Sequence, residues 1–404
     1  MLTGVERRQS SASERRTFEV SILALVLAGF TTFVDVYTTM ALLPYLRRVY
    51  NASEVEVGMT IGATTLAVAL VAPFIGLFSE SIGRKKVIVP AIFCLSVPTF
   101  LAATSQNLHM LIFWRFMQGV FIPGIIAVII AYINEEFAGR GVGRAMSAYV
   151  TGTVAGGFVG RLMPGVIALH FPWRWVFIVQ GVITLLGGFG VRRWLPKAVH
   201  FKKNTDLKAA FRDLFAHFRN SRLIATWAMG FMVLFVLVGL FSYVNFHLAE
   251  PPYNLNSAQL GSIFFVYLLG MVVTPLAGRF MDHNGFLQTV VLSVVILSVG
   301  LVATLAHSLP VIIFGLAIAS TGIFICQAAG TSQTGRVSER ARSSAAGLYV
   351  SFYYIGGSAG SVIPAWAWRH WQWPGCVAVL FVAACLVLVF ARASEIRNAS
   401  VNSA

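Results

Sequence analysis

The sequence predicts an all-α membrane protein in which twelve transmembrane helices form two bundles of six. Its composition, its recurring apolar runs and an internal repeat lead to this fold class. Of the 404 residues, 57% are hydrophobic and only 11% are charged, and the mean hydropathy is +0.77. Soluble chains carry about 25% charged residues, so the composition excludes an ordinary soluble domain.

Apolar runs that are long enough to cross a bilayer, which takes about 20 residues in a helix, recur along almost the whole chain. The first six predicted spans cover 20–43, 57–78, 87–104, 109–133, 145–169 and 174–194, and the second six cover 223–248, 258–280, 287–305, 309–332, 343–365 and 374–392. The chain is therefore expected to divide into a tail (1–19), a first bundle (20–194), a linker (195–222), a second bundle (223–392) and a second tail (393–404).

The basic residues predict the orientation of the spans, because loops rich in Lys and Arg stay in the cytoplasm. Of the 30 Lys and Arg residues, 24 fall in the tails and loops of one side and four in the loops of the other. Both termini are therefore expected inside the cell. The net charge of +15 then reflects topology, and we expect no nucleic-acid partner.

The linker is predicted to contain a short amphipathic helix that begins near Asp206, a favourable residue at a helix start. Its apolar stripe would consist of Leu207, Phe211, Leu214, Phe215 and Phe218. Basic side chains point elsewhere, so this helix is expected to lie on the anionic inner leaflet of the membrane.

Two segments of the first half return in the second half. At a shift of 202 residues, the pattern from Pro73 to Gly83 matches that from Pro275 to Gly285. At a shift of 200 residues, the glycine-rich pattern of span five matches that of span eleven. Repeats of six spans have the same orientation, so they are expected to meet about an axis along the membrane normal. The substrate site of such proteins lies near mid-membrane between the repeats.

The segment Gly76-Leu-Phe-Ser-Glu80-Ser-Ile-Gly83-Arg84-Lys85 resembles the signature of the major facilitator superfamily between spans two and three, with Glu80 where that pattern has Asp. The glycines allow a tight turn, and a carboxylate suits the positive end of a helix. In the family this element latches the inner side of the outward-open state. The resemblance implies that role here for Gly76, Glu80, Gly83, Arg84 and Lys85, and for Asp282 in a weaker second copy. The alternative is a solvated hairpin turn.

Two further segments carry the same resemblance. Arg115-Phe-Met-Gln118-Gly119 in span four resembles the family's R-x-x-q-G element, and the glycines of span five resemble a variant of its antiporter signature, without the Gly-Pro dipeptide. The whole chain resembles the twelve-span drug:proton antiporter branch. That resemblance implies a protein of the inner membrane, and we expect a monomer that uses no cofactor.

Span eleven contains a false hydrolase motif. Gly356-Gly-Ser358-Ala-Gly360 spells G-x-S-x-G, but that motif needs a strand before the serine, and an apolar helix is predicted here. Close helix packing through small residues is the interpretation of both glycine-rich copies: Gly152, Gly156, Gly157, Gly160, Gly356, Gly357 and Gly360. No Walker A loop and no paired histidines at metal-ligand spacing occur. We expect no catalytic site and no metal site.

Three charged residues are predicted at bilayer depth, where a charge is costly and marks a functional site by default. At 1.5 Å per residue, Asp35, Arg115 and Arg161 lie about 13, 10 and 12 Å below the outer ends of their spans. In one reading, Asp35 takes up and releases a proton as its surroundings change, with the two arginines modulating its charge. In the other, Asp35 is a permanently paired anion that fixes the packing of the helices.

Polar and aromatic residues of both halves are candidates for lining a substrate cavity: Tyr37, Gln118, Asn245, Tyr267, Gln327, Tyr353 and Tyr354. Large aromatic rings with few polar groups suit amphipathic organic molecules. The preferred function is proton-coupled export of drug-like or metabolite compounds, with a small-molecule substrate and protons as partners. Proton-coupled or uncoupled uptake of a sugar or organic acid is the second function, and a receptor or scaffold without transport is the third.

Overall fold

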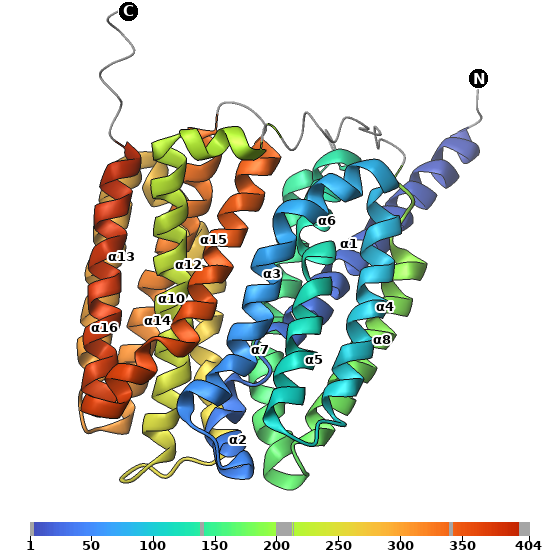
Figure 1. Cartoon of the computed structure of the whole chain (residues 1–404). Helices are drawn as coiled ribbons and strands as arrows, with labels where there is room; N and C mark the ends of the chain where they lie inside the picture. Colours follow the sequence, from blue (N-terminus) through green and yellow to red (C-terminus); the bar gives the residue numbers. More distant parts are fainter. Residues whose placement is uncertain (1–3, 138–140, 199–211, 213, 339–341, 396–404) are drawn as a thin grey trace, which may run out of the picture.

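The computed structural model describes residues 4–137, 141–198, 212, 214–338 and 342–395, and within these ranges it is built of helices and short connections, without a strand. The helices form two side-by-side bundles (Figure 1), one for each half of the sequence. The described chain ends, Gly4 and Glu395, lie at the same end of the molecule. We call the opposite end of each bundle its outer end.

The first bundle follows the predicted spans closely except in its first helix, which begins at Gly4, within the predicted tail. Its helices are α1 (Gly4–Val36), α3 (Glu54–Ile82), α4 (Arg84–Ala102), α5 (Leu108–Phe121), α6 (Pro123–Glu136), α7 (Val142–His170) and α8 (Arg174–Trp194). Between α1 and α3, at the outer end, the chain forms η1 (Met40–Leu42) and α2 (Leu43–Tyr50). Ser53 caps α3 through a capping box with Glu56, which satisfies free amide groups of its first turn.

The second bundle starts after η2 (His217–Arg219). It consists of α10 (Ser221–Ala249), α11 (Ser257–Ser262), η3 (Ile263–Leu268), α12 (Leu269–Asn284), α13 (Phe286–Ala303), α14 (Leu309–Val337), α15 (Arg342–Val362) and α16 (Pro364–Glu395). Eleven helical segments of the described chain are long and apolar enough to span a membrane. The remaining predicted span, span eleven (343–365), corresponds to α15, whose many Gly, Ser and Tyr residues lower its hydropathy. It packs between α10 of its own bundle and α3 of the other.

Three predicted spans are not continuous α-helices, contrary to expectation. Span one changes to a turn after Val36, span four is divided at Pro123, and span eight passes through the 3₁₀ segment η3. The last helix begins before its predicted span, 374–392, and has a kink at Gln372, just ahead of that span, where φ is 52°. Pro123 explains the break in span four, because proline lacks an amide hydrogen. The sequences of the first and third breaks contain neither Gly nor Pro.

The glycine-rich helices pack against the first helix of their own bundle. A Cβ atom added at Gly152, Gly156 or Gly160 of α7 would lie 2.1–2.4 Å from a carbonyl oxygen of α1. In the second bundle, a Cβ atom at Gly356 or Gly360 of α15 would lie 2.0 or 2.3 Å from a carbonyl oxygen of α10. Gly357 faces Leu234 of α10, whereas Gly157 faces the side chain of Arg161. The backbones therefore touch in both repeats, as close small-residue packing requires.

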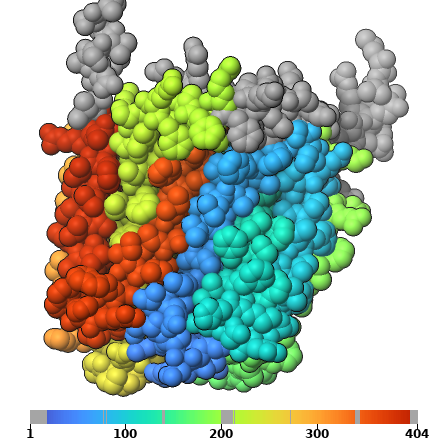
Figure 2. Space-filling model, viewed as in Figure 1, coloured from blue at the N-terminus to red at the C-terminus, as the bar shows by residue number. Residues whose placement is uncertain are grey.

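The two bundles meet along a seam that α3 and α7 form with α15 and α11. Figure 2 shows the surface of α3 (blue) beside that of α15 (orange) along this seam. Near the outer end, a Cβ atom at Gly58 would lie 2.4 Å from the carbonyl oxygen of Ser361, and one at Gly165 would lie 2.1 Å from that of Ser257. Small residues thus bring the outer parts of the bundles into backbone contact.

The predicted amphipathic linker helix falls largely outside the described residues, which exclude Leu207 and Phe211. Of the remaining stripe, Leu214 is buried, while the side chains of Phe215 and Phe218 are exposed. Phe218 also packs its ring edge against Trp227 of α10. These positions leave the membrane-surface helix a prediction.

Candidate functional site

A cavity of about 190 Å³ lies between the two bundles. It is lined by residues near the middle of the spans: Phe33, Tyr37, Thr153, Val154, Gly157, Arg161, Leu234, Leu237, Tyr267, Phe324, Gln327, Tyr353 and Tyr354. Five of the seven residues that the sequence suggested for a substrate cavity are among them, and Arg161 joins them. The lining is mainly aromatic and apolar, and Arg161 is its one charged residue.

Arg161 reaches the cavity from α7 and lies between two tyrosine rings of different bundles. Its Cζ atom is 4.2 Å from the ring centre of Tyr37 and 4.4 Å from that of Tyr267. Stacking of this kind is favourable for a guanidinium group. Its Nη1 atom donates a hydrogen bond of 2.6 Å to the carbonyl oxygen of Gly157, while its buried Nε atom has no hydrogen-bond partner.

Both tyrosines come from places where a span departs from the α-helix. Tyr37 lies in the turn that follows α1, and Tyr267 lies in η3 between α11 and α12. Interrupted helices at mid-membrane are tolerated where they line a cavity, and they often form the binding sites of transporters. The two breaks therefore shape the site, because the residues at them contribute the two rings that contact Arg161.

Two of the suggested cavity residues lie elsewhere. Gln118 is buried within the first bundle, where it accepts a hydrogen bond from Arg115 and donates one to Thr99. Asn245 is buried near the outer end of α10 and donates a hydrogen bond of 2.8 Å to the carbonyl oxygen of Met40 in the other bundle. In this conformation neither side chain is part of the cavity lining.

Asp35 is fully buried inside the first bundle and does not line the cavity. One carboxylate oxygen accepts a hydrogen bond of 3.0 Å from the Thr99 hydroxyl of α4, and the other accepts one of 2.7 Å from the Thr184 hydroxyl of α8. Among the described residues, no basic side-chain nitrogen lies within 4.0 Å of this carboxylate. Asp35 is thus held by hydroxyl groups and has no direct ion pair.

Arg115 binds the backbone at the end of α1. Its Nη1 and Nη2 atoms donate hydrogen bonds of 2.7 and 2.6 Å to the carbonyl oxygens of Asp35 and Val36, and its Nε atom donates one of 3.0 Å to that of Thr60. The carbonyl groups of Asp35 and Val36 lie in the last turn of α1, where carbonyl groups lack partners within the helix, whereas that of Thr60 lies inside α3. Asp35 and Arg115 thus lie inside the first bundle, whereas Arg161 lines the cavity.

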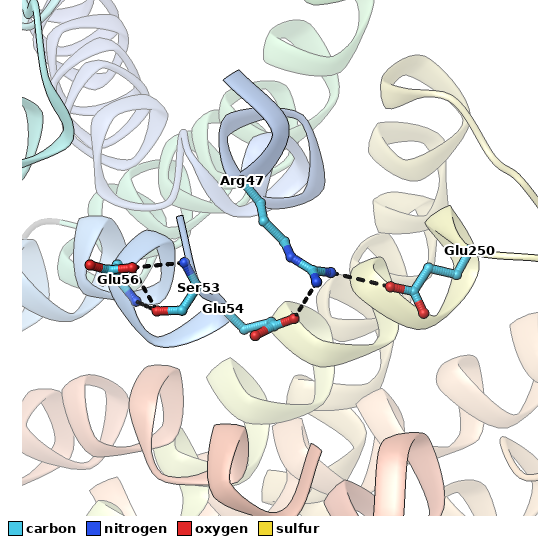
Figure 3. Close-up of polar contacts among 5 residues, drawn as sticks. All are labelled: Arg47, Ser53, Glu54, Glu56 and Glu250. Carbon is cyan, nitrogen blue, oxygen red and sulfur yellow. Dashed lines mark hydrogen bonds and ion pairs between the residues drawn. The ribbon is translucent and has the colours of Figure 1, made fainter. Parts of the chain in front are cut away.

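Polar contacts join the outer ends of the bundles. Arg47 of α2 pairs with Glu54 of its own bundle at 2.9 Å and with Glu250, which follows α10, at 3.2 Å (Figure 3). The neighbouring Glu56 instead completes the cap of α3 with Ser53 (Figure 3). The Arg47–Glu250 pair and the Asn245 hydrogen bond therefore join the outer ends of the two bundles.

The predicted latch lies at the opposite end of α3. Gly83 has a φ of 109° between α3 and α4, a conformation that favours glycine. Arg84 pairs with Glu135 of α6 at 2.5 Å, and Lys85 donates a hydrogen bond to the carbonyl oxygen of Leu195. The side chain of Glu80 and the surroundings of Gly76 lie outside the described part of the structure. In the second copy, Asp282 lies 3.5 Å from Arg336, and both side chains are exposed.

A second, larger cavity of about 740 Å³ opens beside the latch, at the surface. Several basic side chains line it, namely Arg84, Lys85, Lys86, Arg192 and Lys197. Its lining residues come from the ends of helices α3, α4 and α8, and none of them lines the mid-membrane cavity. Its charge matches the expected contact of this face with an anionic leaflet.

Several residues of these sites were not suggested by the sequence. Thr99 and Thr184 hold Asp35, Glu135 holds Arg84, and Glu54 and Glu250 hold Arg47. One signal for the last pair was available, because Arg47 is a basic residue in an outer loop, where the charge rule disfavours it. Threonines in apolar helices are too common to single out two of them.

Comparison with known proteins places these features in context. The family model described as Major Facilitator Superfamily matches residues 25–361 and 248–403. The chain is 30% identical over 370 residues to the inner membrane transport protein YnfM of Escherichia coli (strain K12), covering 90% of this chain and 88% of that protein. It is 29% identical over 364 residues to the uncharacterized MFS-type transporter YybF of Bacillus subtilis (strain 168), covering 90% of each. A crystal structure of the nucleoside transporter NupG has a similar fold, with a TM-score of 0.76 and 13% identity over 93% of this chain and all of that chain.

Proposed function

Because the chain belongs to the major facilitator superfamily and is a transporter of the inner membrane, we propose that it works by alternating access and exports amphipathic organic compounds in exchange for protons. The observation that carries this proposal is the cavity between the bundles, which lies at mid-membrane behind a closed outer side. A substrate in this cavity would contact both bundles. Rotation of the bundles against each other would then carry it to the other face.

The size of the cavity favours metabolite-sized compounds. Pockets for drug-sized ligands measure about 300–1,000 Å³, whereas this cavity measures about 190 Å³. Its rings, including Tyr353 and Tyr354 of α15, offer flat apolar surfaces with hydroxyl groups at their edges. Such a lining suits a small aromatic or otherwise flat organic molecule.

Asp35 is proposed as the proton-coupling residue, with Arg115 as its positioning partner. Both hydrogen bonds to its carboxylate come from threonine hydroxyl groups. A hydroxyl group can donate to a carboxylate or accept from a carboxylic acid, so this site can hold both charge states. Tyr37 follows Asp35 by two residues, in the turn that ends α1. A rearrangement at the carboxyl group is therefore transmitted directly to the cavity through this turn.

Substitution of Asp35 tests the coupling. In proteoliposomes that contain a pH-sensitive dye, the wild-type protein should move protons against a transported metabolite, and an imposed pH gradient should drive that metabolite. Asp35→Asn should abolish both responses while the folded protein still reaches the membrane, because an amide cannot exchange a proton. The exposed Glu395→Gln variant removes a carboxylate at the end of α16 and should behave like the wild type. Flux that still follows the gradient in Asp35→Asn would reject Asp35 as the coupling site.

Proton-coupled uptake of an organic acid is the second candidate, and Arg161 in the cavity favours it. The same vesicles separate the two functions. In export by exchange, substrate and protons move in opposite directions, whereas in uptake by symport they move in the same direction. When the proton concentration is higher outside the vesicles, exchange should therefore move the substrate out of them, whereas symport should move it into them.

A further inference from the structure

We propose that the substrate is an organic anion whose carboxylate, or other singly charged acidic group, binds the guanidinium group of Arg161 between Tyr37 and Tyr267. This inference rests on the proposed transport function and adds the chemical class of the substrate. It does not depend on the direction of transport or on the coupling ion.

The first argument is the charge of Arg161. Its residue surface is only 3% exposed, and no carboxylate oxygen of a described residue lies within 4.0 Å of its nitrogens. A buried cation without an ionic partner is costly. The stacked rings and the carbonyl oxygen of Gly157 offset part of this cost. An anionic ligand would supply the missing opposite charge.

The second argument is the unused hydrogen-bond donor of Arg161. The guanidinium group carries N–H donors at three nitrogens, and one bond, from Nη1 to Gly157, is made within α7. The Nε atom is buried without a partner, although Arg161 lines the cavity. An Arg side chain with an unpaired donor beside a cavity is suited to a planar acidic group, which accepts two parallel hydrogen bonds.

The third argument is the shape of the surroundings. The Cζ atom of Arg161 lies over the rings of Tyr37 and Tyr267, 4.2 and 4.4 Å from their centres, so these two rings limit where the guanidinium group can lie. Phe324 and Tyr353 line the same cavity from the second bundle. A ligand whose acidic group binds Arg161 would therefore place its apolar body among these aromatic rings. Inorganic anions would leave this apolar part of the cavity unfilled.

Three probes with the same ring system and different charge test the inference: 2-naphthoate, 2-naphthamide and 2-(aminomethyl)naphthalene. Binding to the purified full-length protein would be measured by thermal shift and by isothermal titration. 2-Naphthoate should bind at least about tenfold more tightly than the amide, because a charge-assisted pair is worth roughly 1.5 kcal/mol or more. The amine should bind more weakly still. Equal binding of the three probes would overturn the inference.

Variants at position 161 assign the preference to this side chain. Arg161→Gln should weaken the binding of 2-naphthoate about tenfold and change that of the amide little. Arg161→Lys should restore part of the affinity, since it keeps the charge but not the planar donor set. If Arg161 only supported the fold, these variants would lower the melting temperature without changing the ratio between the probes, and the inference would fail.

Gln327→Glu provides an independent variant if Arg161→Gln does not fold. Gln327 lines the same cavity from α14, and the change adds one negative charge with almost no change in shape. It should abolish the preference for 2-naphthoate over the amide. An unchanged preference would contradict the inference. Anion binding that depends on Arg161, combined with no gradient-driven transport, would leave this site standing and reject the proposed coupling instead.

Discussion

Arg115 shows how a charged side chain can serve the backbone inside a membrane protein. It is fully buried, yet its guanidinium group satisfies carbonyl oxygens of Asp35, Val36 and Thr60. The first two belong to the last turn of α1, where the chain leaves the helix. Unsatisfied carbonyl groups at this depth would be costly because water cannot reach them. Arg115 therefore allows α1 to end before the outer end of its span.

Replacement of this arginine by lysine measures that contribution. A compact ammonium group cannot reproduce the spread of the three guanidinium nitrogens, so Arg115→Lys should lose at least one of these buried hydrogen bonds. We expect a loss of about 1–3 kcal/mol, seen as a clear decrease in the melting temperature of the purified protein.

Arg144→Lys is the matched control for this prediction. Arg144 pairs with Glu19 at the surface, where both side chains are more than half exposed, and exposed pairs contribute little. Similar melting temperatures for the two variants would mean that the carbonyl contacts of Arg115 do not stabilise the fold.

At this scale the sequence predicted the depth of the charged residues and not their partners. Asp35 and Arg115 lie close together as expected, because the rise per residue of a helix fixes depth. Their contact runs through the backbone, since α1 ends at Val36 without a Gly or Pro to mark the end. The direction of Arg161 toward the cavity also depends on the rotation of α7, which a single charge does not reveal.

At the scale of the elements, the glycine-rich helices α7 and α15 are the clearest agreement between sequence and structure. Gly152, Gly156 and Gly160 recur every four residues, so they lie on one face of α7 and bring its backbone onto α1. The same spacing in α15 brings it onto α10. Each repeat thus fixes one helix of the seam to the first helix of its own bundle.

A methyl group on this face should separate the helices. A Cβ atom at Gly156 would lie 2.2 Å from the carbonyl oxygen of Phe30, so Gly156→Ala should destabilise the protein by about 1–3 kcal/mol through overpacking. Melting of the purified protein would measure this. Gly143→Ala adds the same group to the same helix where no atom lies within 4 Å, and it should not lower stability. A harmless Gly156→Ala would refute close packing at this contact.

The boundaries of the spans were predictable within a few residues wherever polar loops flank them, as for α8 (Arg174–Trp194). The interruptions of the spans were not predictable, with the exception of the break at Pro123, because proline commonly interrupts a helix. Nothing in the segment Ile263–Leu268 distinguishes η3 from an α-helix, because Ile, Phe, Val, Tyr and Leu fit both. Tertiary packing decides the conformation there, and it also decides where Tyr267 points.

At the scale of the whole molecule, the outer ends are closed by contacts that differ in exposure. The hydrogen bond of Asn245 to Met40 is buried, whereas Arg47 and Glu250 are partly exposed, with 38% and 44% of their side-chain surface accessible. Exposed ion pairs contribute up to about 1 kcal/mol and are screened by salt. The closed state therefore depends partly on a weak, adjustable pair.

Removal of one charge should shift the balance between closed and open outer ends. Spin labels at His109→Cys and Ser308→Cys, with Cys94 and Cys385 replaced by Ser, report the distance between the bundles on this side. Glu250→Gln should increase the open population by at most about fivefold, the equivalent of 1 kcal/mol. High salt should reduce the difference between this variant and the parent protein.

Glu56→Gln is the control on the same face. Glu56 bonds to Ser53 (Figure 3) and forms no ion pair within 4.0 Å among the described residues, and glutamine also serves in a capping box. Its distance distribution should match that of the parent. An unchanged distribution in Glu250→Gln would show that the Arg47 pair does not hold the outer ends together.

The two-bundle organisation was predictable because the repeat fixes the number and the orientation of the helices in each half. The site between the bundles was predictable only in part. Five suggested residues line the cavity, while Gln118 and Asn245 face other partners. Which side of a helix meets the other bundle depends on contacts between residues far apart in sequence. The sequence of a mostly apolar helix gives little information about those contacts.

The seam between the bundles has a mechanical consequence. Gly58 and Gly165 lie against backbone atoms of the opposite bundle, so no side chain of either residue interlocks at these two points, in contrast to ordinary ridges-into-grooves packing. Two smooth surfaces can pivot past one another without first disengaging. The activation barrier for switching should therefore arise mainly from the exchange of polar contacts at the rims, and a change in the medium at either rim should alter the turnover rate directly.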